Sequence, residues 1–371
     1  MSNVPLGEPK NLFRTIRRSR PAQWIAIVLA SIVLAHAIRT ARLPAHQLIG
    51  GMGAGVLGAL LGATVRLPLG AMFFSLSVVC AMIARVMTPS VLGDIAANWP
   101  IFVFMVILVV LLGSVMGWLL ARAGVFPGST AIWGTSPGAP TVMVMLSERY
   151  GADPRLVAFL QYSRVMVVAV VSSVVARLFG ETPGGAGGGG DAPLVAVDWT
   201  GLAQTVALCL VATAVCLRLK NPLWAVVLPM FGGTFLHHGG VIAIELPWWL
   251  QSLAFGAVGL GIGLRFTREI VLHALRSLPK VLGTVFVMIA VCSGFGLFFY
   301  GLIGIDPLSA YLAASPAGMD CIAIIASTLK VNMSFIMAVH VSRLFVVITL
   351  GPAIAVFIAG RLERREQAGM E

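Results

Sequence analysis

Two arginines stand near the middle of long apolar runs, where a charged side chain needs a specific partner. Arg164 lies in the run 155–176 and Arg343 in the run 333–359. If these runs cross a bilayer, an unpaired guanidinium at the centre costs at least about 2.5 kcal/mol. The partner is either the carboxylate or another anionic group of a bound solute, or an acid of the chain itself. The internal acids within reach by sequence are Asp320 for Arg343, and Glu148 or Asp153 for Arg164.

A Ser-Pro pair precedes each arginine, in GTSPGAPT at 134–141 and in AASPAGMD at 313–320. Proline removes an amide donor and glycine loosens a helix, so both segments predict helix breaks, read here as re-entrant hairpins. Breaks at membrane depth line cavities in transporters, where the exposed helix N-termini, with their positive dipole ends, suit anionic groups. Proline kinks that serve packing alone are the alternative. The predicted substrate-binding residues are Ser136, Pro137, Gly138, Arg164, Ser315, Pro316, Gly318 and Arg343.

The two segments belong to a duplication that keeps one offset, from Arg164 to Arg343, without gaps over most of each half. Pro68 matches Pro247, and Gly117 matches Gly296. The predicted organisation is a basic cytoplasmic tail (1–23), a first membrane repeat (24–179), a Gly-rich linker (180–199), a second membrane repeat (200–360) and a basic C-terminal tail (361–371).

Asp320 and His340 break the symmetry of the duplication, because Thr141 and Gln161 occupy the matching positions of the first half. A carboxylate and an imidazole found in one half only predict an ion-coupling site for a proton or for sodium. The alternatives are a structural cap or an arginine partner for Asp320, and a hydrogen-bonded interior histidine for His340.

The composition fits a membrane protein, with 58% hydrophobic and 11% charged residues and a mean hydropathy of +0.97. The predicted fold is an all-α polytopic membrane protein with two inverted-topology repeats, each of about five crossing helices plus one re-entrant or broken segment. The long apolar runs are 24–38, 101–121, 155–176, 281–300 and 333–359. The shorter ones are 47–65, 69–84, 201–217, 223–243 and 248–264.

Charge in equivalent loops predicts the inversion, because Lys and Arg collect on the cytoplasmic side. The loop 86–99 has one acid, Asp94, and no Lys or Arg, whereas 265–280 carries three arginines and a lysine. Both termini and 265–280 are therefore expected in the cytoplasm, and Asp94, the linker and Asp306 in the periplasm. Arg39 and Arg42 fall on the wrong side in this scheme. The formal charge of +11 sits in such flanks, which argues against nucleic-acid binding.

Patterns for enzymatic chemistry are missing from the sequence. The five cysteines are scattered through apolar runs, and the adjacent His237 and His238 would point to different faces of a helix, so no metal site and no cofactor are predicted. The basic N-terminus resembles a signal peptide, but its apolar run has a counterpart at 203–220 and is expected to be retained. The expected partners are a small-molecule solute, membrane lipids and, for a homo-oligomer, a second copy.

The half-unit resembles that of the membrane AbrB-duplication family of Gram-negative bacteria. The resemblance rests on Thr135-Ser136-Pro137-Gly138, on Gly151-Ala152-Asp153, on Gln161 with Arg164, and on Ser315-Pro316-Ala317-Gly318 with Asp320 and Arg343. Ala139-Pro140 and His340 depart from the family pattern. The expected function is secondary transport of a small anionic solute across the inner membrane. A membrane-embedded regulator of gene expression is the alternative, which the family's label implies.

Overall fold

The structure, a computed structural model of the chain, is helical throughout the residues it describes, and these residues contain no strand. The described residues are 19–41, 43, 45–86, 99–124, 126, 128–136, 143–144, 147–148, 150–179, 198–220, 224–266, 278–343 and 346–347. The helices of the first half are α2 (Arg20–Thr40), α3 (His46–Leu60), α4 (Leu69–Val86), α6 (Trp99–Arg122), α7 (Gly128–Thr135) and α9 (Pro154–Leu178).

The second half has helices with matching bounds. They are α10 (Trp199–Leu219), α11 (Trp224–Val227), the π-helix η1 (Leu228–Gly232), α12 (Gly233–His238), α13 (Trp248–Gly263), α15 (Leu278–Ile303), α16 (Pro307–Ala314) and α17 (Met319–Ser327), followed by a helical stretch at 333–343. α2 and α10 have 21 residues each, and α7 and α16 have 8 each. α3 is continuous, whereas its counterpart is divided into α11, η1 and α12, with Pro229 inside the π-helix.

Five helices are long and apolar enough to cross a membrane: Arg20–Thr40, Val103–Arg122, Pro154–Leu178, Trp199–Leu219 and Pro279–Gly301. This confirms the all-α, membrane-type fold. The run 201–217, grouped above with the shorter ones, belongs to the 21-residue helix Trp199–Leu219, whose first turn is capped by Asp198. Hydrogen bonds from the Thr200 hydroxyl and amide hold the pKa of the Asp198 carboxyl below its ordinary value.

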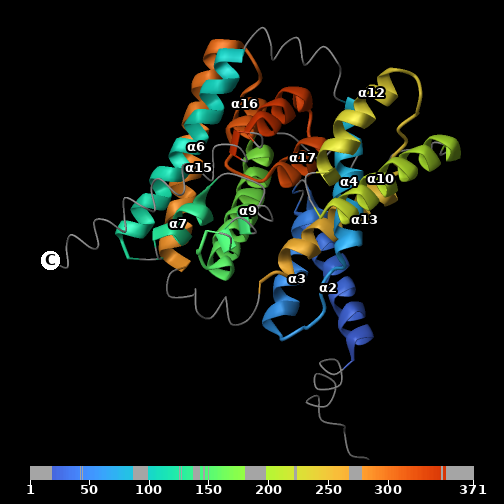
Figure 1. Cartoon of the computed structure of the whole chain (residues 1–371), viewed down its shortest axis with the longest axis horizontal. Coiled ribbons are helices and arrows are strands. Elements are labelled where there is room, and N and C mark those ends of the chain that lie inside the picture. The colour runs from blue at the N-terminus through green and yellow to red at the C-terminus, as the bar shows by residue number, and fades with distance from the viewer. Residues whose placement is uncertain are drawn as a thin grey trace, which may run out of the picture.

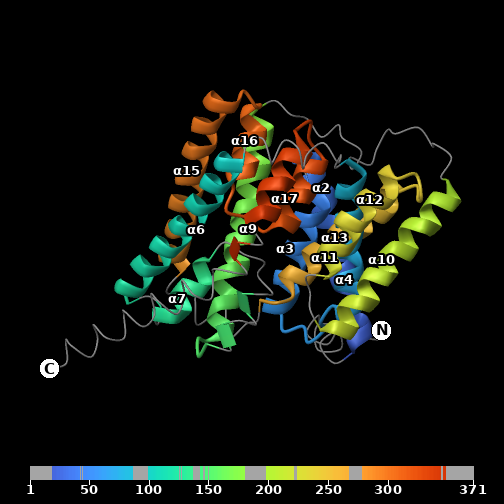
Figure 2. The same ribbon diagram turned by 45° about the horizontal axis from the view of Figure 1, so that its top comes forward.

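The helices form two bundles, and each bundle takes helices from both halves of the sequence (Figure 1). The glycine bundle contains α2, α3, α4 and α10 to α13, whose pairs α3–α13, α2–α3, α4–α13 and α4–α10 pack together. The arginine bundle contains α6, α7, α9, α15, α16 and the stretch 333–343, with the pairs α6–α7, α15–α16 and α7–α9. α17 lies between the bundles and packs against α4 and α9 (Figure 2).

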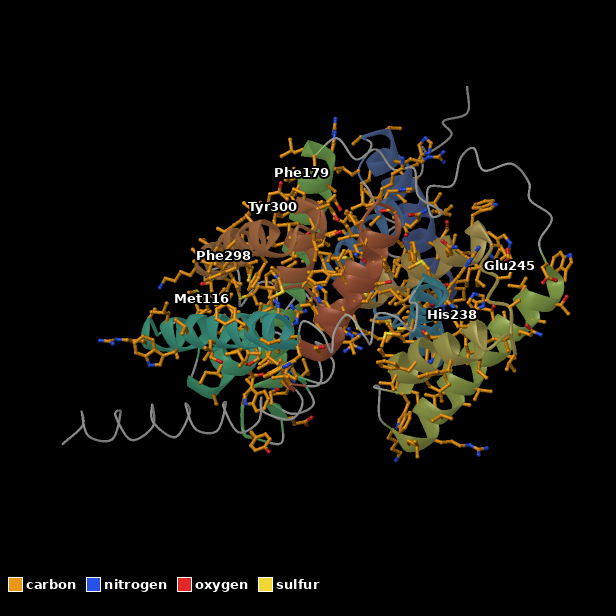
Figure 3. All side chains as sticks on the ribbon, turned by 90° about the horizontal axis from the view of Figure 1, so that it is seen from above. Met116, Phe179, His238, Glu245, Phe298 and Tyr300 are labelled. Carbon is orange, nitrogen blue, oxygen red and sulfur yellow. The ribbon has the colours of Figure 1, made fainter. Side chains whose placement is uncertain are left out.

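Apolar side chains cover the outward faces of the arginine bundle. Phe298 and Tyr300 on α15 are 58% and 45% exposed, and Figure 3 shows them on the same side of the molecule as Met116 of α6. His238 and Glu245 lie on the opposite side (Figure 3). Aromatic and aliphatic side chains on a long helix suit contact with lipid, so these faces fit a membrane environment.

Candidate functional site

The chain breaks at the predicted Ser-Pro position in the second half. α16 ends at Ala314, Ser315 is extended (φ −55°, ψ 136°), and α17 begins after Gly318 (φ −69°, ψ 145°). Pro316 lies between the two helices. In the first half α7 ends at Thr135 and Ser136 lies in a bend, whereas Pro137 and Gly138 lie outside the described residues.

Each short helix runs parallel to the later helix that carries the arginine of its half: α7 to α9, and α16 to the stretch 333–343. In the first half the amide of Asp153, just before α9, donates to Thr130 Oγ1 near the start of α7 (3.2 Å), and Gln161 further along α9 contacts the carbonyl of Trp133. In the second half the amide of Asn332 donates to Ser309 Oγ near the start of α16 (2.7 Å). The later helix of each half therefore begins at the level where the short helix begins.

Arg164 binds the carboxyl end of α7. Its Nη1 donates to the carbonyls of Thr135 and Ser136, both at 3.0 Å, and its Nη2 donates to Gln161 Oε1 at 2.7 Å. Gln161 in turn donates through Nε2 to the carbonyls of Trp133 (2.8 Å) and Ser136 (2.9 Å). The side chain of Arg164 is 1% exposed. The guanidinium therefore neutralises the negative end of the α7 dipole inside the protein.

Arg343 binds the carboxyl end of α16 in the same way. Its Nη1 donates to the carbonyl of Ser315 (2.7 Å), and its Nη2 donates to the carbonyl of Ala317 and contacts His340 Nδ1 at 2.8 Å. His340 Nε2 contacts the carbonyl of Leu312 at 3.0 Å. Arg343 and His340 are 3% and 1% exposed. His340 thus occupies the place that Gln161 has in the first half.

The structure places backbone carbonyls, and no acid among its described residues, around Arg164. The proposed partners Glu148 and Asp153 are exposed, and the Asp153 carboxylate instead accepts from the amides of Arg155 and Leu156 as the N-cap of α9. The internal ion pairs considered for Arg164 are therefore wrong. For Arg343 the pairing with Asp320 stays a prediction, because the side chain of Asp320 lies outside the described residues.

The two arginine sites lie close enough for their charges to interact. The positive charges of Arg164 and Arg343 repel each other, and both interact electrostatically with Cys292 of α15. The hydroxyls of Ser172 on α9 and Tyr311 on α16 also share a hydrogen bond of 3.2 Å, which joins the two halves. The carboxyl end of each short helix thus lies inside the arginine bundle, bound by its own arginine.

Two polar atoms at these sites are buried and lack a hydrogen-bond partner among the described residues: Nε of Arg164 and Oγ of Ser315. Arg164 also lines a cavity of about 10 Å³, the room that one water molecule needs. The cavity is mostly apolar, and its lining comes from Leu120, Gly134, Thr135, Leu160, Arg164, Val281, Thr284, Val285 and Met288. Both arginine sites therefore keep hydrogen-bonding capacity that the described residues do not use.

The sequence did not identify the carbonyls of Trp133 and Leu312, or Gln161 as a residue of the site. The equal three-residue spacing of Gln161 from Arg164 and of His340 from Arg343 was the available signal, because residues three apart share a helix face. The described residues contain no group of three or more His, Cys, Asp or Glu side chains that could hold a metal ion. His237 Nδ1 instead lies 3.2 Å from the carbonyl of Ile242.

Comparison with known proteins gives two relatives. The chain is 38% identical over 348 residues to the Escherichia coli protein named "Putative regulator AbrB", covering 92% of this chain and 98% of that protein. It is 27% identical over 276 residues to the Bacillus subtilis "Uncharacterized protein YhjN", covering 71% and 72%. No solved structure matches.

The profile of the family described as "Transition state regulatory protein AbrB" matches residues 47–359, which include every helix from α3 to α17 and both arginine sites. A match of this extent, together with the Escherichia coli relative over nearly its whole length, shows that the chain belongs to the AbrB family.

Proposed function

We propose that the protein is a secondary transporter of a small anionic solute in the inner membrane, built from two inverted repeats. The observation that carries the proposal is the pair of short helices, α7 and α16, whose carboxyl ends are each bound by a buried arginine. Broken segments that converge near the middle of a bundle are the binding architecture of transporters with inverted repeats. Ionisable residues inside a membrane protein are rare and commonly mark a binding site or an ion pathway.

The paths of the short helices support the inversion. Since each short helix is parallel to the later helix that carries the arginine of its half, the segment between them enters and leaves on one side, as a re-entrant hairpin does. The proposal takes α2, α3, α4, α6 and α9 as the five crossing helices of the first half; of these, α2, α6 and α9 are long and apolar enough by themselves. An odd number of crossings starts the second half on the opposite side. Arg66 lies before α4, whereas the equivalent position before α13 holds Glu245, and this difference in positive charge is consistent with inversion.

An anionic solute fits the charges of the site. Two guanidiniums that repel each other, held in a low dielectric, attract an anion more strongly than the same pair would in water. Nε of Arg164 and Oγ of Ser315 are available as donors to it. The arrangement in two bundles provides a means of exposing the site to either side, by movement of the arginine bundle against the glycine bundle.

A membrane-embedded regulator is the second candidate, and the name of the Escherichia coli relative favours it. Purified protein in proteoliposomes separates the two functions. A transporter should accumulate radiolabelled mono- or dicarboxylates saturably, and only while a proton or sodium gradient is imposed. Binding of such solutes to protein in detergent, without flux in liposomes and with altered gene expression on deletion, would establish the regulator instead.

The inverted topology predicts which loops a membrane-impermeant maleimide reaches in intact cells. Asp94→Cys and Asp306→Cys are expected to be labelled from outside, whereas Arg276→Cys should react only after permeabilisation. The native cysteines among the described residues are buried, which keeps the background low. Labelling of Arg276→Cys in intact cells would rule out the inverted arrangement.

A further inference from the structure

His340 and Gln161 make the same contacts at the two arginine sites, but only the histidine can gain a proton. Each side chain contacts a carbonyl of the preceding short helix, at 3.0 Å for His340 and Leu312 and at 2.8 Å for Gln161 and Trp133. Each also contacts Nη2 of the arginine three residues later, at 2.8 Å and 2.7 Å. The two sites therefore share these contacts, but only the site of His340 can bind a proton.

The contacts of His340 determine which ring nitrogen carries hydrogen. A carbonyl oxygen only accepts, so Nε2 must donate to Leu312. A guanidinium only donates, so Nδ1 must be bare to accept from Arg343. A second proton would have to enter at Nδ1 and would face the N–H of Arg343. Protonation of His340 and its hydrogen bond with Arg343 therefore exclude each other.

The groups around His340 oppose a second proton on its imidazole ring. Arg343 lies on the same helical stretch and repels a positive imidazolium. Arg343 interacts electrostatically with Cys292 on α15 and with Arg164 on α9. Tyr311 on α16 is adjacent to Leu312 in the sequence. Asp320 on α17 is acidic, but its side chain lies outside the described residues. The described groups contribute positive charge and weak acids, and none would neutralise a protonated His340.

We propose that His340 is a proton-binding site that releases the second re-entrant segment and leaves the first unaffected. When Nδ1 takes a proton, the Nη2 of Arg343 loses its acceptor, and the like charges separate the two side chains. Arg343 also holds the carbonyls of Ser315 and Ala317, so the turn between α16 and α17 loosens with it. The inference rests on the proposed function, for which it supplies the coupling ion.

The test measures the two segments separately and needs no solute. Ser315→Cys and Ser136→Cys place a thiol at equivalent positions, and N-ethylmaleimide alkylation of each is followed from pH 8 to pH 5.5 by mass spectrometry of the labelled peptide. The ratio of the two rates cancels the pH dependence of the reagent. With His340 present, the ratio of the rate at 315 to the rate at 136 should rise as the pH falls, by up to about tenfold per pH unit.

His340→Gln is the matched variant, because Gln161 shows that glutamine fits these contacts. In this variant the ratio should stay constant over the pH range. An equal rise with and without His340 would overturn the proposal, and so would a constant ratio in the presence of His340. Neither result depends on whether the protein transports a solute, so failure here and failure of the transport assay are distinct.

Thermal unfolding in detergent provides a second measurement, without introduced thiols. The unfolded chain binds a proton at His340 freely, whereas the folded chain must first break the bond with Arg343, so stability should fall as the pH falls below about 6.5. The unfolding temperature of the His340→Gln variant should lack this decrease. If both proteins lose the same number of degrees between pH 8 and pH 5.5, His340 is not the responsible group.

Discussion

Arg343→Ala is expected to destabilise the folded protein by at least about 3 kcal/mol, because each buried acceptor left without a donor costs about 1–3 kcal/mol. The substitution removes the donors to the carbonyls of Ser315 and Ala317 and to His340 Nδ1. Arg164→Ala should cost less. The carbonyl of Ser136 keeps its bond from Gln161, so Thr135 and the Gln161 amide oxygen are the acceptors that lose a donor.

Thermal unfolding in detergent measures the stability losses of the two variants. The fraction of monodisperse protein after heating is a second readout. Arg155→Ala is the matched control, since Arg155 lies on the same helix as Arg164 but is exposed, and its loss should change stability by less than about 0.5 kcal/mol. Equal stability of the Arg343→Ala and Arg155→Ala proteins would contradict the role assigned to the buried guanidinium.

Sequence patterns identified these arginines and the breaks before them, because apolar runs interrupted by charge or proline report directly on the backbone. They did not identify the partners. Glu148 and Asp153 were the acids nearest to Arg164 in the sequence, yet the guanidinium binds carbonyls, which every residue has and no sequence letter distinguishes. The constant offset did place the two arginines at equivalent positions of the two halves.

Helix length was harder to predict than helix position. The apolar run 201–217 was grouped with the shorter ones, but the helix extends from Trp199 to Leu219, and Asp198 caps its first turn. The glycines of α3, at positions 50, 51, 53, 55 and 58, are typical of close helix packing, but the sequence does not name the partner helix. That partner, α13, comes from the other half of the chain, and contacts so distant in sequence leave no local pattern.

The contact between α3 and α13 allows a sharp test, because glycines on both helices bring the two backbones together. A Cβ on Gly259 would lie 2.2 Å from the carbonyl oxygen of Leu48, and one on Gly51 would lie 2.5 Å from that of Gly256. Such contacts involve backbone rather than the end of a flexible side chain, so the helices themselves must separate.

Gly259→Ala is therefore expected to destabilise the protein by about 1–3 kcal/mol or more, through overpacking of the helix pair. Gly256→Ala, on the same helix three residues away, is the matched control. A Cβ there meets nothing within 4 Å, so alanine should stabilise α13 by up to about 1 kcal/mol through its higher helix propensity. The measurement is the unfolding temperature of both variants in one detergent. Opposite signs are expected, and a decrease of equal size in both would mean that glycine serves α13 through its backbone freedom and not through the approach of α3.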